Sequence, residues 1–176
     1  MSMRNKLVGI IILVSVCLFQ CNPDDTVPGF EMTYFREFEI FAGLNTFDTH
    51  VFQLPNFDTE YESFLNNNGV VEEQVTQIVP RAFRITNVTG NITFEDLQRV
   101  RLFMSNTDGT LEREIAFLEP IPSNIGYQID LVPTLADSKI IMETGDFDLL
   151  LKLNYRSIPS QSIDARLNVV FQAITE

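Results

Sequence analysis

Cysteine, histidine and tryptophan are nearly missing from this chain of 176 residues, which has two cysteines, one histidine and no tryptophan. Catalytic triads, Cys–His pairs and most zinc sites need a positioned imidazole with partners around it. The single histidine, His50, lies in a strand-like stretch beside Phe52, without metal-ligand spacing around it. The sequence also lacks a phosphate-binding loop, a dinucleotide-binding fingerprint and a zinc cluster. We therefore predict no enzyme activity, no catalytic or metal-binding residues and no cofactor.

Positive charge is scarce as well. Twelve Lys and Arg residues stand against 24 Asp and Glu residues, which gives a net charge of −12. A surface this acidic repels phosphate backbones and anionic lipid headgroups. We therefore expect no nucleic-acid partner, and we expect any membrane attachment to use something other than a basic patch. The acidity could attract divalent cations, although a solvated surface is its commoner explanation.

The chain opens with an apolar run that is too short to span a bilayer. Arg4 and Lys6 precede 13 uncharged residues, Leu7 to Phe19. A spanning helix needs about 20 apolar residues, whereas a run of this length after cations is typical of a secretory signal. A short buried helix of the folded domain is the alternative, which the terminal position and the charge order disfavour. We predict a signal peptide over residues 1–20.

The two cysteines lie near the end of this run. Leu18-Phe19-Gln20-Cys21 resembles the lipobox, where a bacterial peptidase cuts before a cysteine that becomes lipidated. Leu18 fits that pattern, whereas Gln20 replaces the preferred small residue. Cys17 is the rival, but it would leave two apolar residues at the start of the mature chain. We place the lipid on Cys21, where the apolar run gives way to polar sequence.

The segment after the cysteine is polar and acidic. Asn22-Pro23-Asp24-Asp25 resembles the export signal of Bacteroidota lipoproteins on the outer face of the outer membrane. Asp25-Thr26-Val27 is similar to the O-glycosylation site of these bacteria, which implies a glycan on Thr26. The plain alternative for residues 21–29 is a flexible acidic linker that cannot bury enough surface to fold. Both interpretations are compatible. The resemblance implies an outer-membrane lipoprotein that faces the cell exterior, with its lipid on Cys21.

The remaining chain fits one domain. Removal of residues 1–20 would change the net charge from −12 to −14 and leave no free thiol once Cys21 carries the lipid. Residues 30–176 are enough for a single domain with a real core, and no repeat or second linker divides them. Phenylalanine would supply much of the core volume, because the chain has 15 of them and no tryptophan.

Alternation of apolar and polar residues predicts an all-β domain. Residues 147–155 and 163–173 alternate most clearly, which indicates two strands with one buried face each. We expect residues 156–162 to join them as a hairpin-like loop. Pro80 would place a bulge or a sheet edge in its strand, and Gly109 would close a turn before a strand that pairs back. Six further strands are predicted, over residues 32–40, 49–54, 77–88, 100–104, 111–118 and 127–132. We predict a β-sandwich of seven or eight antiparallel strands, with a small β-barrel as the alternative.

Three short helices are predicted between the strands. Residues 59–65 begin with a candidate cap and end in Asn66-Asn67-Asn68-Gly69. Residues 93–96 resemble a capping box with Asp in place of Glu. Residues 134–143, followed by Gly145, indicate a helix of two turns.

Two carboxylate pairs are the remaining catalytic candidates. Glu112 lies with Glu114, and Asp146 with Asp148, on the faces of predicted strands. Paired carboxylates can hydrolyse glycosides when they are held about 5 to 9 Å apart, but such pairs also arise by chance in an acidic protein. The stretch 106–112 is similar to a fragment of a calcium loop, although its acids are wrongly spaced. The sequons at Asn87 and Asn91 would normally stay unused in a bacterial chain.

Anchoring information without a catalytic constellation favours a non-catalytic binding or assembly component of the outer membrane. Its partner could be another outer-membrane protein, reached through a strand edge or an apolar patch. The alternative is a glycan-binding module for nutrient capture, in which exposed Tyr34, Tyr61 or Tyr127 would stack on sugars. A small acid/base hydrolase that uses the carboxylate pairs is the least favoured alternative.

Overall fold

The computed structural model describes residues 29–90 and 92–176 of the chain. The predicted signal peptide, Cys21, the acidic segment after it and Thr26 lie outside these described residues, as does Asn91. The strands are β1 (Gly29–Ile40), β2 (His50–Asp58), β3 (Val75–Asn87), β4 (Leu97–Ser105), β5 (Glu112–Leu118), β6 (Gln128–Pro133), β7 (Asp146–Tyr155) and β8 (Ile163–Thr175). The helices between them are α2 (Tyr61–Asn68), the 3₁₀ turn η1 (Glu72–Gln74) and α3 (Lys139–Met142).

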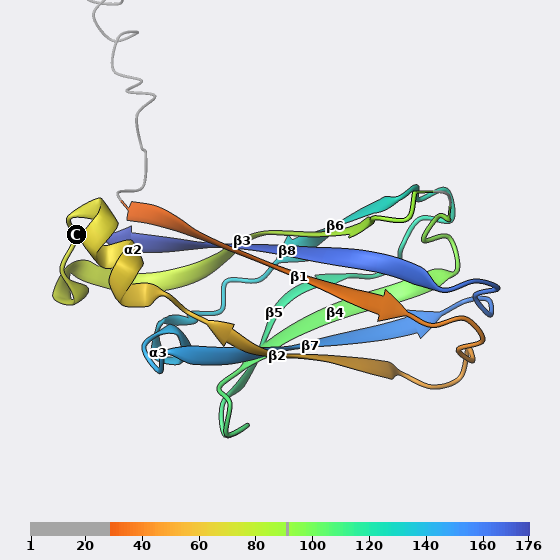
Figure 1. Cartoon of the computed structure of the whole chain (residues 1–176), viewed down its shortest axis with the longest axis horizontal. Coiled ribbons are helices and arrows are strands. Elements are labelled where there is room, and N and C mark those ends of the chain that lie inside the picture. Colours follow the sequence, from red (N-terminus) through yellow and green to blue (C-terminus); the bar gives the residue numbers. More distant parts are fainter. Residues whose placement is uncertain (1–28, 91) are drawn as a thin grey trace, which may run out of the picture.

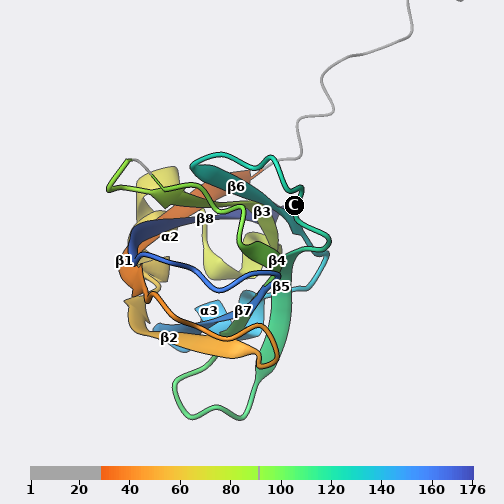
Figure 2. The same ribbon diagram turned by 90° about the vertical axis from the view of Figure 1, so that its right-hand side faces the viewer.

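The eight strands form two antiparallel layers packed face to face (Figures 1 and 2). One layer has the order β1-β8-β3-β6 and the other has the order β2-β7-β4-β5. Two residue pairs between β5 and β6 join the layers into one sheet along one side. This strand order is that of a double Greek-key jelly roll. The predicted antiparallel β-sandwich of about eight strands is therefore confirmed.

The core lies between the two layers. It forms because apolar and polar side chains alternate along each strand, with a period of two residues. Leu149, Leu151 and Leu153 of β7 and Leu167 and Val169 of β8 are fully buried, while the residues between them are more exposed. Successive side chains of a strand point to opposite faces, so this alternation gives each layer one inward apolar face.

Aromatic rings fill the centre of the sandwich. Phe147 of β7 stacks on Phe57 of β2, with ring centroids 4.9 Å apart, and meets Phe171 of β8 edge to face at 6.3 Å. Tyr34 of β1 packs against both Phe147 and Phe171. Rings from both layers thus interlock, and they supply the volume that tryptophan would fill elsewhere.

Side chains hold the layers together along the side where β1 faces β2. The Tyr34 hydroxyl donates a hydrogen bond to the Thr59 carbonyl oxygen, 2.6 Å away. The Arg36 guanidinium lies 4.4 Å from the ring centroid of Phe57 and donates to the carbonyl oxygen of Asn56. Arg36 interrupts the apolar face of β1 because it bridges the two layers here instead of entering the core.

Two sequence-based turn features are confirmed. Residues 106–111 connect β4 to β5 as a hairpin, and Gly109 takes a left-handed φ of 72° there. Pro80 lies at a bulge, where the register between β3 and β8 shifts between Pro80 and Ala82. Strand β6 pairs with β3 only from Phe83 onward, so the missing N–H of Pro80 breaks no ladder on that side.

Three predictions about connections were wrong. Residues 156–162 are no hairpin, because β7 and β8 belong to different layers and this loop crosses between them. Residues 93–96 form a turn, since Phe94 is buried and its N–H donates to the Gly126 carbonyl. The helix expected over 134–143 shrinks to α3, because Ser138 bonds back to Ile78 of β3 through its N–H. The helix expected over residues 59–65, by contrast, is present as α2, although it begins two residues later, at Tyr61.

The connections divide between two ends of the sandwich. β1 begins and β8 finishes at the end that carries α2 and α3, which we call the helix end (Figure 1). The loops 41–49, 119–127 and 156–162 lie at the opposite end, together with residues 88–90 and 92–96, and we call it the distal end. With 12 residues in β1 and a rise of roughly 3.3 Å per residue, the two ends are about 40 Å apart.

Candidate functional site

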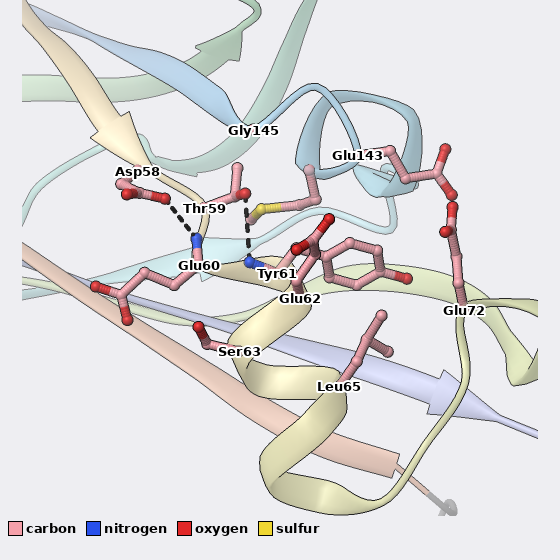
Figure 3. A pocket seen from close by; sticks show the side chains of 11 residues that line it. Asp58, Thr59, Glu60, Tyr61, Glu62, Ser63, Leu65, Glu72, Glu143 and Gly145 are labelled. Atoms are coloured by element: carbon pink, nitrogen blue, oxygen red, sulfur yellow. Dashed lines mark hydrogen bonds between the residues drawn. The ribbon is translucent and has the colours of Figure 1, made fainter.

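A hollow of about 330 Å³ opens at the helix end, where β2 runs into α2 (Figure 3). Its walls come from the end of β2, the first turn of α2, η1 and the segment that follows α3. Five carboxylates line this acidic pocket: Asp58, Glu60, Glu62, Glu72 and Glu143.

A sharp change of direction between β2 and α2 builds the pocket wall. Glu60, the N-cap residue of α2, has a φ of 47°, which few residues other than glycine adopt. Asp58 Oδ1 accepts the Glu60 N–H at 2.8 Å, and Thr59 Oγ1 accepts the Tyr61 N–H at 3.4 Å (Figure 3). The Thr59 N–H also donates to the Gly145 carbonyl at 2.9 Å. These bonds fix the start of α2 against the segment after α3.

A buried tyrosine, Tyr61, lies in the wall of the acidic pocket. The side chain is 6% exposed, and its hydroxyl has no hydrogen-bond partner among the described residues. Burial, followed by the charges of Glu143 and Glu72, raises the pKa of Tyr61 to about 12. Lys139 Nζ lies 3.3 Å from Glu143 Oε1 and offsets part of the acidity. The pocket can attract cations, but no group of three His, Cys, Asp or Glu among residues 29–90 and 92–176 is arranged to hold a metal ion.

The distal end presents an ordered loop, residues 41–49, between β1 and β2. Asn45 organises it, since its Oδ1 accepts the N–H groups of Phe47 and Asp48, both at 2.9 Å. Asn45 Nδ2 donates to the Asp48 carboxylate, and the Asn45 carbonyl oxygen lies 2.8 Å from His50 Nε2. The side-chain amide of Asn154 on β7 holds the Asp48 carbonyl and the Thr49 hydroxyl. The loop is thereby fixed on two sides.

This loop and its neighbour expose apolar side chains. Phe47 is 93% exposed, and Phe41 and Ile158 are more than half exposed. The Gly43 N–H donates to the Pro159 carbonyl at 2.8 Å, which ties loop 41–49 to loop 156–162. We call these three exposed residues of the two joined loops, Phe41, Phe47 and Ile158, the distal tip. Single exposed apolar residues are ordinary on a protein surface, but a large aromatic ring is also the kind of side chain that dominates the binding energy of many protein interfaces.

Exposed carboxylates are frequent at the distal end. Five exposed acidic residues lie at this end, and we call them the acidic rim: Glu39, Asp48, Glu95, Glu119 and Asp164. Arg156 also lies there, but its guanidinium donates to the backbone carbonyls of Leu97 and Ile121. The distal end therefore carries both the exposed apolar side chains of the distal tip and the acidic rim.

Two of the three tyrosines expected to form a sugar platform are not available for it. Tyr34 is 8% exposed and Tyr61 is 6% exposed, because both point inward between packed elements. Only Tyr127 is exposed, at 48%. The expectation missed Phe35, which is 65% exposed on the outer face of β1. The signal was present in the alternation, since Tyr34 is in phase with the apolar Met32 and Phe35 is out of phase with it.

Three of the four carboxylates expected as catalytic candidates make structural contacts. Glu112 lies 3.2 Å from Lys152 Nζ, and Glu114 lies 3.6 Å from the Arg101 guanidinium. Asp148 accepts the N–H of Asn56 at 2.9 Å, next to the bulge of β2. None of the four carboxylates of the two pairs is among the residues that line the acidic pocket.

Other sequence features also have structural roles. His50 contacts the ring of Tyr155 edge to face, with centroids 5.5 Å apart, and binds the Asn45 carbonyl. Asn87, in one of the two sequons, is 6% exposed and donates through its amide to the Ile92 carbonyl. The stretch 106–112, similar to a calcium loop, is the hairpin turn between β4 and β5. Within the described part of the chain, no helix has the length and apolarity needed to cross a bilayer.

No protein-family model matches the chain, and neither does any curated protein. Among solved structures, it is similar to infectious bursal disease virus, Gt strain, with 12% identity over 81% of this chain and a TM-score of 0.37. The chain spans 32% of that protein's length. It is also similar to the BFDV capsid protein, with 10% identity over 83% of this chain and 98% of that one and a TM-score of 0.35. At these identities and TM-scores the similarities carry no functional argument.

Proposed function

We propose that this chain is a lipid-anchored surface protein of the bacterial outer membrane, and that its jelly-roll domain is a non-catalytic binding module. The lipid is carried by Cys21, and the domain docks on a protein partner through the distal tip. The observation that carries this proposal is the 93% exposure of Phe47 on an ordered loop, at the end of the sandwich opposite to the start of β1.

The positions of the two ends support a lipid anchor near the helix end and a binding surface at the distal end. Seven residues, 22–28, separate Cys21 from the first residue of β1, so the helix end is the one nearest to the proposed lipid. The distal tip is about 40 Å farther from the anchor, given the rise of a strand. A binding surface held at that distance is free of the membrane and faces other molecules at the cell surface.

The chemistry of the distal tip indicates the kind of partner. Exposed aromatic residues dominate the binding energy of many protein interfaces, and loop order lowers the entropy that binding costs. The acidic rim favours an apolar depression surrounded by Lys or Arg side chains on the partner. The same rim disfavours insertion of Phe47 among anionic lipid headgroups, which it would repel.

Affinity capture from intact outer membrane in mild detergent tests this proposal with the full chain. Wild type should retain a partner in fixed stoichiometry, and Phe47→Ala should lose most of it because the exposed ring is the anchor. Phe35→Ala, which removes an exposed phenylalanine from a sheet face, is the matched control and should capture the same amount of partner as wild type does. Equal capture by wild type and Phe47→Ala would contradict the role of the distal tip.

Surface display is tested separately. Protease added to intact cells should remove the domain from wild-type cells, while a periplasmic marker protein stays whole. Full protection of the domain in intact cells, with digestion after the outer membrane is opened, would contradict an orientation toward the exterior.

A further inference from the structure

A groove crosses the outer face of the β1-β8-β3-β6 layer, away from the distal tip and the acidic pocket. It is an open groove with a volume of about 490 Å³, within the range of roughly 300–1,000 Å³ that is usual for small-ligand sites. The outward-facing side chains that line it come from three neighbouring strands, and Asn168 and Val170 among them are half-buried: Arg81, Ala82, Arg84, Asp130, Asn168 and Val170.

Strand register places four different side chains in one row across this face. Phe35 of β1 lies opposite Asn168 of β8, Asn168 lies opposite Arg84 of β3, and Arg84 lies opposite Asp130 of β6. With strands about 4.8 Å apart, the row is about 14 Å long, the length of a short oligosaccharide. The adjacent row contributes Val170 and Ala82, which give the groove a small apolar floor.

Two polar groups of the row, Arg84 and Asp130, bind each other and keep further hydrogen-bonding capacity. Arg84 Nε donates to Asp130 Oδ1 at 2.6 Å, and Gln128 donates to the other carboxylate oxygen at 3.1 Å. The bond from Arg84 keeps the pKa of Asp130 below its usual value. Among the described residues, Arg84 makes hydrogen bonds through Nε alone, so its two terminal nitrogens stay available as donors. Planar donors and acceptors in fixed positions suit ligands with many hydroxyl groups.

The charge of this face differs from that of the domain. The described residues carry the same excess of acid as the whole chain, −12, since the masked residues contain two cations and two acids. In the groove, by contrast, each arginine has one carboxylate: Arg81 pairs with Glu31 at 2.7 Å and Arg84 with Asp130. A locally neutral groove beside an exposed aromatic ring complements a neutral polyhydroxylated ligand.

We propose that this groove binds a neutral glycan, with Phe35 stacking on the apolar face of one sugar ring and Asn168, Arg84 and Asp130 hydrogen-bonding the hydroxyls of the next ones. Phe35 is at the end of the row, and the Arg166 guanidinium carbon lies 5.8 Å from the centroid of its ring. This site is separate from the distal tip, so it goes beyond the proposed protein partner and does not depend on it.

The test uses the full chain, extracted in mild detergent, on an array of neutral and acidic polysaccharides that includes starch, xylan, mannan and mixed-linkage glucan. Wild type should bind at least one neutral polysaccharide, and titration with its soluble oligosaccharides gives the affinity. Phe35→Ala should weaken that affinity by about tenfold or more, the scale of one lost stacking contact. Arg84→Lys keeps the positive charge but removes the planar guanidinium group with its fixed N–H donors, so it should weaken glycan binding as well.

Phe47→Ala is the matched control, because it removes a more exposed phenylalanine at the distal tip. It should bind the glycan as wild type does, whereas Phe35→Ala should still capture the protein partner. Circular dichroism and thermal unfolding should show that each variant is folded. No binding to any neutral polysaccharide, preference for acidic ones only, or equal affinity of wild type and Phe35→Ala would overturn the inference.

Discussion

The hydroxyl of Tyr34 on β1 donates a 2.6 Å hydrogen bond to the carbonyl oxygen of Thr59, which joins the two layers of the sandwich where α2 begins. Thr59 is 2% exposed, so no water replaces this bond readily. The contact links the first strand to the wall of the acidic pocket, where the same hydroxyl also lies 3.9 Å from Met142 Sδ.

Tyr34→Phe should lower the free energy of unfolding by about 1–2 kcal/mol, because it leaves a buried carbonyl without its donor. The ring contacts with Phe147 and Phe171 are kept in this variant, so the loss reports on the hydrogen bond. Urea denaturation measures the change. Tyr127→Phe removes a hydroxyl from an exposed tyrosine and should change stability by far less; equal losses in both variants would contradict a special role for Tyr34.

Stability should fall at alkaline pH because three tyrosines are buried. Burial raises the pKa of Tyr34, Tyr61 and Tyr155 above the ordinary value of 10, to about 12 for Tyr61. These raised values mean that folding favours the neutral phenol, so the stabilisation is complete below pH 10 and is lost as pH rises through the folded-state values. Tyrosinate absorbance and denaturant midpoints over the alkaline range measure this. A midpoint that stays constant well above pH 10 would refute it.

The order of loop 41–49 should depend on one side chain. Asn45→Ala removes the acceptor of the Phe47 and Asp48 amides and should speed their hydrogen exchange, while the amides of β7 and β8 keep their protection. The free energy of unfolding should fall by only about 1 kcal/mol. Asn68→Ala, which removes one exposed side-chain bond to Phe64 at the end of α2, is the control and should leave loop 41–49 unchanged. Unaltered exchange at Phe47 in Asn45→Ala would show that the loop is ordered by other contacts.

The strands could be predicted from the sequence because burial on one face imposes a period of two. Residues 147–155 and 163–173 show that period clearly, and both are strands. The period does not specify partners, however, which is why residues 156–162 were expected to be a hairpin. In the jelly roll, the chain changes layer at that loop, and only contacts between distant parts of the sequence determine this.

Local helix signals failed where tertiary contacts compete with them. The capping-box pattern at residues 93–96 gives way to burial of Phe94 at the distal end. Residues 134–138 stay extended because backbone N–H groups of Thr134 and Ser138 bond to Ile115 and Ile78. Short helices are marginal by themselves, so a few such bonds are enough to override them.

The candidate sites were harder to predict than the fold. The acidic pocket gathers carboxylates from β2, α2, η1 and the segment after α3, which no local pattern brings together. The row through Phe35 and Arg84 likewise depends on the order of four strands. Only the exposure of Phe35 was accessible in advance, because it alternates with buried neighbours along β1.

Fatty-acid labelling is the measurement that tests the central claim, a lipid on Cys21, most directly. Cells grown with a labelled fatty acid should incorporate it into wild type and into Cys17→Ala, and Cys21→Ala should carry none. Label on Cys21→Ala at the wild-type level, or unlabelled wild-type protein released into the medium, would contradict the anchor and with it the proposed surface attachment.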